Sequence, residues 1–379
     1  MIKTSAHFIL LLLAVLSCQS EKTTTVNGSL QQQAIVDSTF TAFKKAIITQ
    51  QIDSVFSKTG FNGGISVEHN GEKMYERFDG FENFKTKKPL DSNSVFAIGS
   101  VSKQFAAAMI MRLEENGKLS TADKISKYLP EYRSKTFEEI TIHHLLTHTS
   151  GISDLGPGLQ SKPGAEFNYS NKGYRVLGEI VESASGKSYD ENARELFFKA
   201  GISNTYTAEH FTGKNLAGAH TGTARNATAV QNMPRRLAHS SISTAAGGIL
   251  STASDLHRWN LALYNGKLLQ PNSLKKFLAK TSEMKHPVIG PVNYGYGIML
   301  AASPASYVHT GYVNGSPSLS IFYPDSNTSV VILSNIADMG RGKNAVFNPH
   351  KEVKRITDLI ENALTEMNSP PPKKVTVNN

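Results

Sequence analysis

The feature that most constrains this chain is a serine followed three residues later by a lysine, at the start of a helix-forming run. Ser100 and Lys103 precede the stretch 106–113, which is rich in alanine and methionine and carries apolar residues at helical spacing. This spacing predicts that the two side chains share one helix face. An amine with a lowered pKa beside a serine hydroxyl can accept its proton and turn the serine into an acylating nucleophile.

The serine–lysine pattern alone is weak evidence, because it occurs three times in this chain. Ser273 with Lys276 and Ser282 with Lys285 fit the same template. An isolated match of this length is more often part of a solvated surface than a catalytic pair. Further motifs in the right order are therefore needed before Ser100 can be singled out.

A second motif is Tyr169-Ser170-Asn171, which lies between a Pro-Gly turn at 163–164 and a helix-like run over 172–184. A tyrosine hydroxyl can relay protons, and an asparagine amide can both donate to and accept from a bound amide. The alternative interpretation is an ordinary turn with a packed tyrosine, and Tyr312-Val313-Asn314 repeats the pattern.

A third motif, His309-Thr310-Gly311, precedes two strand-like runs at 318–323 and 329–334. A strand edge that carries a hydroxyl, a polar side chain and a glycine can line a site and let a substrate backbone approach closely. The copy at 220–222 lacks following strands, so the later copy is the preferred one. A single histidine is otherwise more often packed or exposed than catalytic.

Taken in this order, the three motifs resemble those of the penicillin-recognising serine hydrolases. The nearest branch is the class C β-lactamase-like one, with its D-alanyl-D-alanine peptidases, D-aminopeptidases and esterases. The phrases at 142–152, 250–256 and 293–297 resemble this family too, and the similarity runs from about residue 35 to about residue 365. The resemblance implies an α/β (α+β) fold of the β-lactamase/transpeptidase kind, in which helices flank an antiparallel sheet and an all-helical lobe is inserted.

The resemblance also implies a role for each matching residue. Ser100 would be the nucleophile, Lys103 its base, and Tyr169 the group that shuttles protons and activates the deacylating water. Asn171 would position the substrate amide and the lysine. The remaining substrate-binding residues would be His309, Thr310, Gly311 and Tyr312, and the backbone N–H groups of Ser100 and Tyr312 would form the oxyanion hole. No cofactor is implied.

One departure from the family pattern bears on the substrate. His309 stands where many β-lactamases and penicillin-binding proteins have a lysine, and a histidine near its ordinary pKa is largely neutral at pH 7. Recognition of a substrate carboxylate would then be weaker. A β-lactam, a D-Ala-D-Ala peptide, a D-amino-acid amide and a short ester all remain open as substrates, and a peptidoglycan-derived peptide is among the candidates. A catalytically silent peptidoglycan binder or sensor on the same fold is the alternative.

The N-terminal segment predicts export. A basic start at 1–3 is followed by an apolar core at 8–16, too short to span a bilayer comfortably, and then by Cys18, the only cysteine of the chain. This pattern is typical of a bacterial lipobox, with lipidation at Cys18 and a polar tether over 19–34, and a plain secretory signal is the alternative. We expect a protein anchored by lipid to a bacterial membrane and facing the periplasm or cell exterior. Its domain would span 35–367 and a disordered tail 368–379.

Composition excludes several other classes. The chain has 39% hydrophobic and 19% charged residues, which supports a folded core and argues against disorder. The net charge of +9 is spread out without interleaved aromatic residues, so no nucleic-acid partner is expected. The Gly-x-Ser-x-Gly elbow of α/β-hydrolases is absent. His144 and His148 have the spacing of metal ligands, yet no glutamate lies between them, so we expect a structural role and no metal.

The order of strand-like and helix-like stretches predicts one antiparallel sheet closed by both chain ends, with a helical lobe inserted between them and Ser100 at the junction. The predicted strands are 63–69, 73–78, 295–300, 306–309, 318–323 and 329–334, with helices at 35–56 and 351–364 and a mostly helical region over 100–278. Asn70-Gly71 between the first two strands is a strong hairpin signal.

Overall fold

The computed structural model describes residues 30–31, 35, 38–39, 41–231, 243–342 and 344–368. The predicted signal segment, Cys18 and residues 369–379 of the predicted tail lie outside these residues, whereas Asn368, the first residue of that tail, ends a helix. The chain divides into two compact units, residues 1–51 and 52–379, and the second carries the site. Residues 41–59 are helical. Among the described residues, no helix combines the length and apolar character needed to cross a membrane.

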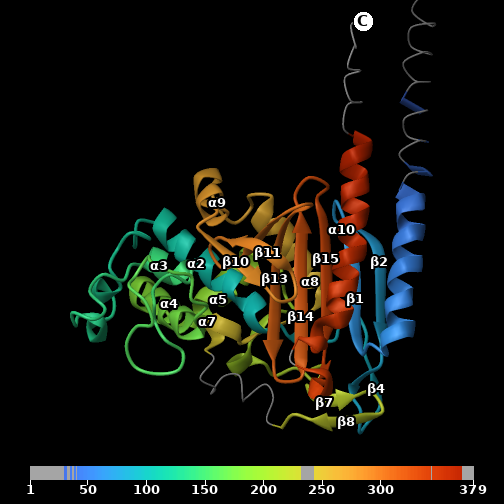
Figure 1. The fold of residues 1–379 in the computed structure, drawn as a ribbon, viewed down its shortest axis with the longest axis horizontal. Coiled ribbons are helices and arrows are strands. Elements are labelled where there is room, and N and C mark those ends of the chain that lie inside the picture. Colours follow the sequence, from blue (N-terminus) through green and yellow to red (C-terminus); the bar gives the residue numbers. More distant parts are fainter. Residues whose placement is uncertain are drawn as a thin grey trace, which may run out of the picture. The chain divides into compact units, whose positions relative to one another are not determined.

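The second unit is built on an eight-stranded antiparallel sheet (Figure 1). The strand order is β10-β11-β12-β13-β14-β15-β1-β2. Strand β1 pairs with β15 from Gly63 opposite Ser334 to His69 opposite Thr328. This pairing joins the N-terminal hairpin to the C-terminal strands, which confirms the predicted sheet closed by both chain ends. Its strands are β1 (Gly63–His69), β2 (Glu72–Asp79), β10 (Ser282–His286), β11 (Gly290–Tyr294), β12 (Met299–Ala302), β13 (Ala305–Val313), β14 (Ser316–Tyr323) and β15 (Thr328–Ser334).

Helices and short strands complete this unit. The helices are α2 (Lys103–Glu115), α3 (Ile142–Leu146), α4 (Asn171–Ser185), α5 (Tyr189–Ala200), α7 (Thr244–Gly247), α8 (Ala253–Tyr264), α9 (Pro271–Phe277) and α10 (Asn348–Asn368). The short strands are β3 (Phe81–Asn83), β4 (Lys88–Pro89), β5 (Phe96–Ala97), β6 (Tyr206–Thr207), β7 (His220–Thr223), β8 (Asn226–Ala229), β9 (Ile249–Ser251) and β16 (Ile336–Ala337). The 3-10 turns are η1 (Gly99–Ser102), η2 (Ile125–Lys127), η3 (Pro130–Tyr132), η4 (Ala208–His210), η5 (Met339–Arg341) and η6 (Ala345–Phe347).

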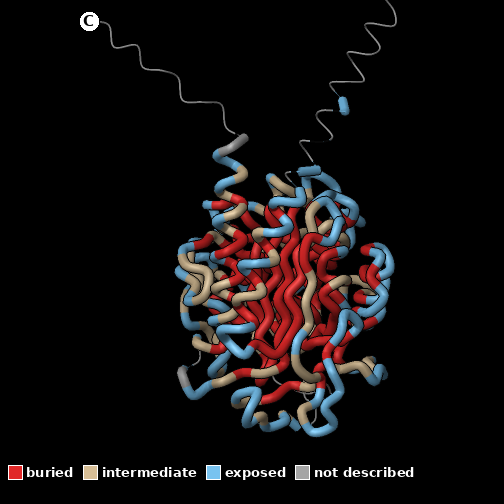
Figure 2. Tube along the Cα trace, turned by 90° about the vertical axis from the view of Figure 1, so that its right-hand side faces the viewer, coloured by how far each residue is buried: buried red, intermediate tan, exposed pale blue. Residues whose placement is uncertain are grey.

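Helices α8 and α10 cover opposite faces of the sheet. Side chains alternate between the two faces along a strand, so Ser320 and Tyr323 of β14 point to opposite sides. Ser320 accepts a hydrogen bond of 3.0 Å from Asn260 of α8, whereas the Tyr323 hydroxyl lies 2.7 Å from that of Thr357 on α10. With both faces covered, β14 and β15 are buried along their whole length (Figure 2). These strands are therefore buried on both sides, and Ser320, one of the serines that they carry, has its hydrogen-bond partner inside the protein.

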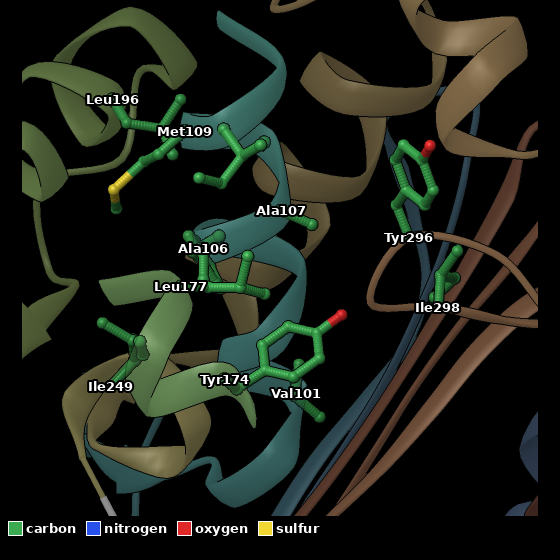
Figure 3. Packing of buried hydrophobic residues seen from close by; sticks show 14 of the residues in the cluster. Val101, Ala106, Ala107, Met109, Tyr174, Leu177, Leu196, Ile249, Tyr296 and Ile298 are labelled. Carbon is green, nitrogen blue, oxygen red and sulfur yellow. The ribbon is translucent and has the colours of Figure 1, made fainter. Parts of the chain in front are cut away.

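Helix α2 forms the centre of the helical lobe (Figure 3). All of its residues from Lys103 to Met111 are buried, and it packs against α4, α5 and α7. Met109 of α2, Leu177 of α4 and Leu196 of α5 belong to one apolar cluster. Because the helix is enclosed on all sides, its first residue, Lys103, is taken out of water together with the apolar residues that follow it.

The structure corrects parts of the coarse secondary-structure prediction. The region predicted as mostly helical contains the short strands β6 to β9, and the third sheet strand spans 299–302 rather than 295–300. The β10–β11 hairpin was not predicted. Strand β10 lies at the sheet edge, and its residues are alternately half-buried and exposed. Its sequence Ser-Glu-Met-Lys-His has only one apolar residue, so it lacks the apolar alternation by which a strand is recognised.

Candidate active site

Ser100 lies in the turn η1, between strand β5 and helix α2, where the sheet meets the helical lobe. The turn depends on Gly99, whose φ of +52° is favourable for glycine and unfavourable for residues with a side chain. A Cβ atom at Gly99 would lie 2.5 Å from the backbone nitrogen of Tyr312 on β13. Gly99 therefore lets the turn that carries Ser100 pack closely against the backbone of Tyr312.

Gly311 of the third motif serves the same close approach from the other side. A Cβ atom at Gly311 would lie 1.9 Å from the carbonyl oxygen of Ile98. The Ser318 hydroxyl donates to the same carbonyl oxygen at 2.7 Å. The motif predicts that this glycine makes room for a substrate backbone. The neighbour that requires it here is the protein's own backbone, just before the nucleophile turn.

Lys103 is completely buried, and three oxygen atoms surround its amine. The Nζ atom lies 2.8 Å from the Ala246 carbonyl oxygen, 2.9 Å from Asn171 Oδ1 and 3.1 Å from Ser100 Oγ. The carbonyl and amide oxygens can only accept hydrogen bonds, while the serine hydroxyl can also donate. A neutral amine gives its two hydrogens to the two obligate acceptors, and its lone pair is then left for the Ser100 proton.

Burial also favours this neutral form. Removal of the amine from water lowers the pKa of Lys103 from its ordinary 10.5 to about 7, and the negative charge of Asp154 only partly opposes this. The aromatic rings of Tyr169 and Tyr174 lie 4.8 and 5.3 Å from Nζ. The site therefore holds an amine that can accept a proton near neutral pH.

Tyr169 brings a phenol hydroxyl to the same place. Burial of this hydroxyl raises its pKa, which the hydrogen bond with Ser100 opposes, so the phenol is protonated at neutral pH. One ring face lies against His148, with centroids 4.2 Å apart and planes tilted by 35°. The residue as a whole keeps 36% exposure, so it stands where solvent or a substrate can reach it.

Asp154 holds Asn171 in place, and sequence analysis missed this residue. Its carboxylate accepts hydrogen bonds from the backbone N–H groups of Asn171 and Lys172 and from the Ser170 hydroxyl, at 2.8 to 2.9 Å. Asn171 Nδ2 also donates to it at 3.3 Å, which directs Oδ1 towards Lys103. Asp154 comes from a loop that precedes helix α4 by more than fifteen residues, so no local pattern links it to the second motif.

His309 is fully buried, and both of its ring nitrogens are used within the protein. Nδ1 lies 2.7 Å from the carbonyl oxygen of Thr310, which can only accept, so Nδ1 carries the hydrogen. Nε2 then accepts from the Tyr294 hydroxyl at 3.1 Å. Burial and the nearby Lys103 lower the pKa of His309 to about 3, so the imidazole is neutral. Thr310, which is 7% exposed, lies 3.1 Å from His286 Nε2.

The other copies of the motifs are placed elsewhere. Ser273 lies on α9, where Lys276 pairs with Glu114 at 2.9 Å. Ser282 lies on strand β10 and Oγ is 3.5 Å from the Thr147 carbonyl oxygen. His220 is on β7 and packs edge-on against Phe84. The structure thus brings Ser100, Lys103, Tyr169 and Asn171 together and leaves these copies apart.

The two histidines with metal-ligand spacing have other partners. His144 Nδ1 accepts from the Thr141 backbone N–H and completes the capping box of α3. His148 has a φ of +57°, and its Nδ1 accepts from the Ser170 backbone N–H at 3.1 Å. Across the described residues, no three His, Cys, Asp or Glu side chains are grouped as metal ligands would be.

Comparisons with known proteins show the family and the fold of this chain. The model of the family described as Beta-lactamase matches residues 42–347. The "Putative penicillin-binding protein PbpX" of Bacillus subtilis (strain 168) is 29% identical over 363 residues, which cover 86% of each chain. A penicillin binding protein from Bacillus halodurans superimposes with a TM-score of 0.68 at 25% identity, covering 81% of this chain and 98% of that one. D-amino acid amidase from Ochrobactrum anthropi SV3 has the same fold, with a TM-score of 0.71 at 20% identity, covering 84% and 99%.

Proposed function

The chain belongs to the β-lactamase family of serine hydrolases, and on this premise we propose that it cleaves an amide or ester through an acyl-enzyme on Ser100. One observation carries the proposal. The amine of Lys103 faces two obligate acceptors and one serine hydroxyl, so in its neutral form it is already a base directed at the nucleophile. A lysine held only for packing or charge pairing would not need this arrangement.

Acylation proceeds in two proton transfers. Ser100 Oγ attacks the substrate carbonyl carbon while Lys103 takes the hydroxyl proton, and the carbonyl oxygen becomes an oxyanion. The backbone N–H groups of Ser100 and Tyr312 donate to that oxyanion. Gly99 and Gly311 support this role, because they let the turn around Ser100 and strand β13 pack closely together. When the bond to the leaving group breaks, the proton passes to the leaving nitrogen or oxygen, with Tyr169 as the relay. Ser100 is left as an ester of the acyl group.

Deacylation reverses these roles with water. Tyr169 lies against Lys103 and accepts a proton from the incoming water as it passes its own to the amine. Water oxygen bonds to the acyl carbon, the bond to Ser100 Oγ breaks, and the proton returns to the serine. Asn171 keeps the amine in position throughout.

Covalent labelling tests the proposed function. A fluorescent acyl-phosphonate probe is expected to label the wild-type protein and to leave Ser100→Ala unlabelled, because only an activated serine reacts. Ser273→Ala and Ser282→Ala are matched controls, since they remove the serine of the other two copies of the pattern, and they should be labelled like wild type. Absence of labelling in correctly folded wild-type protein would refute the hydrolase and favour a silent peptidoglycan binder.

We further propose that the preferred substrates lack a free carboxylate. The imidazole that replaces the usual lysine is buried and uncharged, so it offers no cation to a carboxylate. D-amino-acid amides and short esters then fit better than β-lactams. His309→Lys tests this with steady-state kinetics on a cephalosporin and a p-nitrophenyl ester. A charge-assisted hydrogen bond should raise cephalosporin kcat/KM by about one to two powers of ten and leave the ester flat or lower. Equal responses of the two substrates would refute the proposal.

We propose that the protein is exported and anchored by lipid at Cys18, from the apolar segment and single cysteine of its N-terminus. Metabolic labelling with an alkyne fatty acid is expected to mark wild type and not Cys18→Ala, which should become soluble or remain unprocessed. Equal labelling of the two proteins would refute the anchor.

A further inference from the structure

A second histidine stands directly behind the third motif. His286 ends strand β10, at the tip of the β10–β11 hairpin, and its Nε2 lies 3.1 Å from Thr310 Oγ1 on β13. Among the described strands, β12 pairs with β13 only as far as Val308. Thr310 therefore lies beyond the end of that ladder, where the hairpin tip reaches it. Figure 1 shows β10, β11 and β13 at this edge of the sheet.

The hydrogen bonds of His286 determine which of its nitrogens carries the hydrogen. Nδ1 lies 3.1 Å from the backbone nitrogen of Val288 and 3.2 Å from that of Ile289, and both groups donate to it. A backbone N–H cannot accept, so Nδ1 has no hydrogen of its own. In the neutral imidazole the hydrogen is then on Nε2, which donates to Thr310 Oγ1.

This donation decides the direction of the threonine hydroxyl. An oxygen that accepts along one direction turns its own hydrogen to another, so the Thr310 hydroxyl keeps a hydrogen to donate, one residue before the Gly311 backbone that packs against Ile98 at the start of the nucleophile turn. We propose that His286 is a positioning residue that fixes the Thr310 hydroxyl as a hydrogen-bond donor to an oxygen in the substrate's leaving group. This inference rests on the proposed acyl-enzyme function and adds a substrate feature to it, namely an acceptor oxygen beyond the scissile bond.

The surroundings of His286 hold it in this state. Val288 packs against an apolar cluster that contains Ala337, Val346 and Phe347, which fixes the hairpin tip. Burial, with a smaller contribution from the positive charge of Lys351, lowers the pKa of His286 to about 4. His286 is therefore uncharged, and the group that faces the substrate is the hydroxyl of Thr310, which is also uncharged. It recognises an ester or amide carbonyl without requiring a charge on the substrate.

A double-mutant cycle tests the inference with two substrates. The substrate that carries the acceptor is N-acetyl-D-alanyl-D-lactate methyl ester, whose leaving group has a carbonyl oxygen, and phenyl acetate lacks one. We expect His286→Leu and Thr310→Val each to lower kcat/KM for the depsipeptide by about fivefold to tenfold, as for one neutral hydrogen bond. The double variant should be no worse than either single one, and phenyl acetate turnover by His286→Leu should change little.

Two further variants separate positioning from mere support of the fold. His286→Gln keeps an N–H donor and should recover most of the depsipeptide activity. Lys285→Leu introduces the same apolar residue at the neighbouring exposed position of β10 and should behave like wild type. Multiplying losses in the double variant, or an equal loss on phenyl acetate, would overturn the inference. Acyl-phosphonate labelling of Ser100 in every variant keeps this outcome distinct from failure of the proposed function.

Discussion

Replacement of Lys103 by methionine, an apolar side chain of similar length, should abolish activity and change the stability of the protein in a pH-dependent way. Burial lowers the pKa of Lys103 from 10.5 to about 7. A tenfold change in a protonation equilibrium is worth about 1.4 kcal/mol, so keeping the ammonium form inside the protein costs about 5 kcal/mol. We therefore expect Lys103→Met to be inactive and, at low pH, more stable than wild type.

The sign follows from proton binding. Between pH 7 and 10.5 the unfolded chain holds a proton on this lysine and the folded protein does not, so wild-type stability rises there by about 1.4 kcal/mol per pH unit. Lys103→Met lacks this slope. It also leaves the Asn171 and Ala246 oxygens without a donor, at a pH-independent cost of about 1–3 kcal/mol each. Lys103→Met should therefore be more stable than wild type at pH 6 and less stable than wild type above about pH 10.

Urea unfolding at pH 6.0, 7.5 and 9.5 measures this difference. The free energy of unfolding of Lys103→Met minus that of wild type should fall by about 3 kcal/mol between pH 6.0 and pH 9.5. Ser100→Ala retains the amine and is the control, whose stability should run parallel to wild type. If the Lys103→Met and wild-type curves are parallel as well, the lysine is not held neutral and the proposed base is wrong.

Three further perturbations address the other parts of the site. Because Lys103 must be neutral to act, kcat/KM should rise with pH through about 7. Asp154→Asn should move this rise to lower pH, because a negative charge near the amine is lost, and should lower the maximum by about tenfold, because Asn171 loses its support. An unchanged midpoint would contradict this. Tyr169→Phe should slow deacylation more than acylation, so a stopped-flow experiment should show a burst of product followed by accumulation of the acyl-enzyme. Equal slowing of both steps would mean that another group activates the water. Gly99→Ala should lower kcat by about a hundredfold with little change in KM, because its Cβ would force Ser100 and Tyr312 apart, and wild-type kcat would exclude their N–H groups as the oxyanion donors.

Much of this site could be predicted from sequence because its parts are local motifs. The Ser100–Lys103 pair is set by one helical turn, and the apolar run behind it on α2 already implies that the lysine is buried. The sheet was predictable for the same reason, since β1, β2, β14 and β15 each show their own composition or turn signal. Tyr169 lies 69 residues from Ser100, so its place beside the amine followed only from the family resemblance.

The residues that were missed act through tertiary contacts. Asp154 lies in a loop and reaches the second motif only because the chain folds back on the start of α4. His286 belongs to a polar edge strand without an apolar pattern, so neither the strand nor its contact with Thr310 could be inferred. The ordinary pKa of histidine indicates that His309 is largely neutral, but it does not say which ring nitrogen carries the hydrogen. The Thr310 carbonyl and the Tyr294 hydroxyl fix that tautomer. Hydrogen bonds between distant residues leave no local signal in a sequence.

A common physical device links the basic side chains of this site. Lys103, His148, His286 and His309 could each carry a positive charge, and for each of them burial lowers the pKa. Their hydrogen bonds agree, because His148 and His286 accept from backbone N–H groups and His309 accepts from a phenol. Positive charges on the histidines would also disfavour protonation of Lys103 and so keep it available as a base. They would, however, stabilise a bound anionic substrate before it reacts. With these groups neutral, stabilisation of the oxyanion falls to backbone N–H dipoles, which interact more strongly with the transition state than with an uncharged ester or amide.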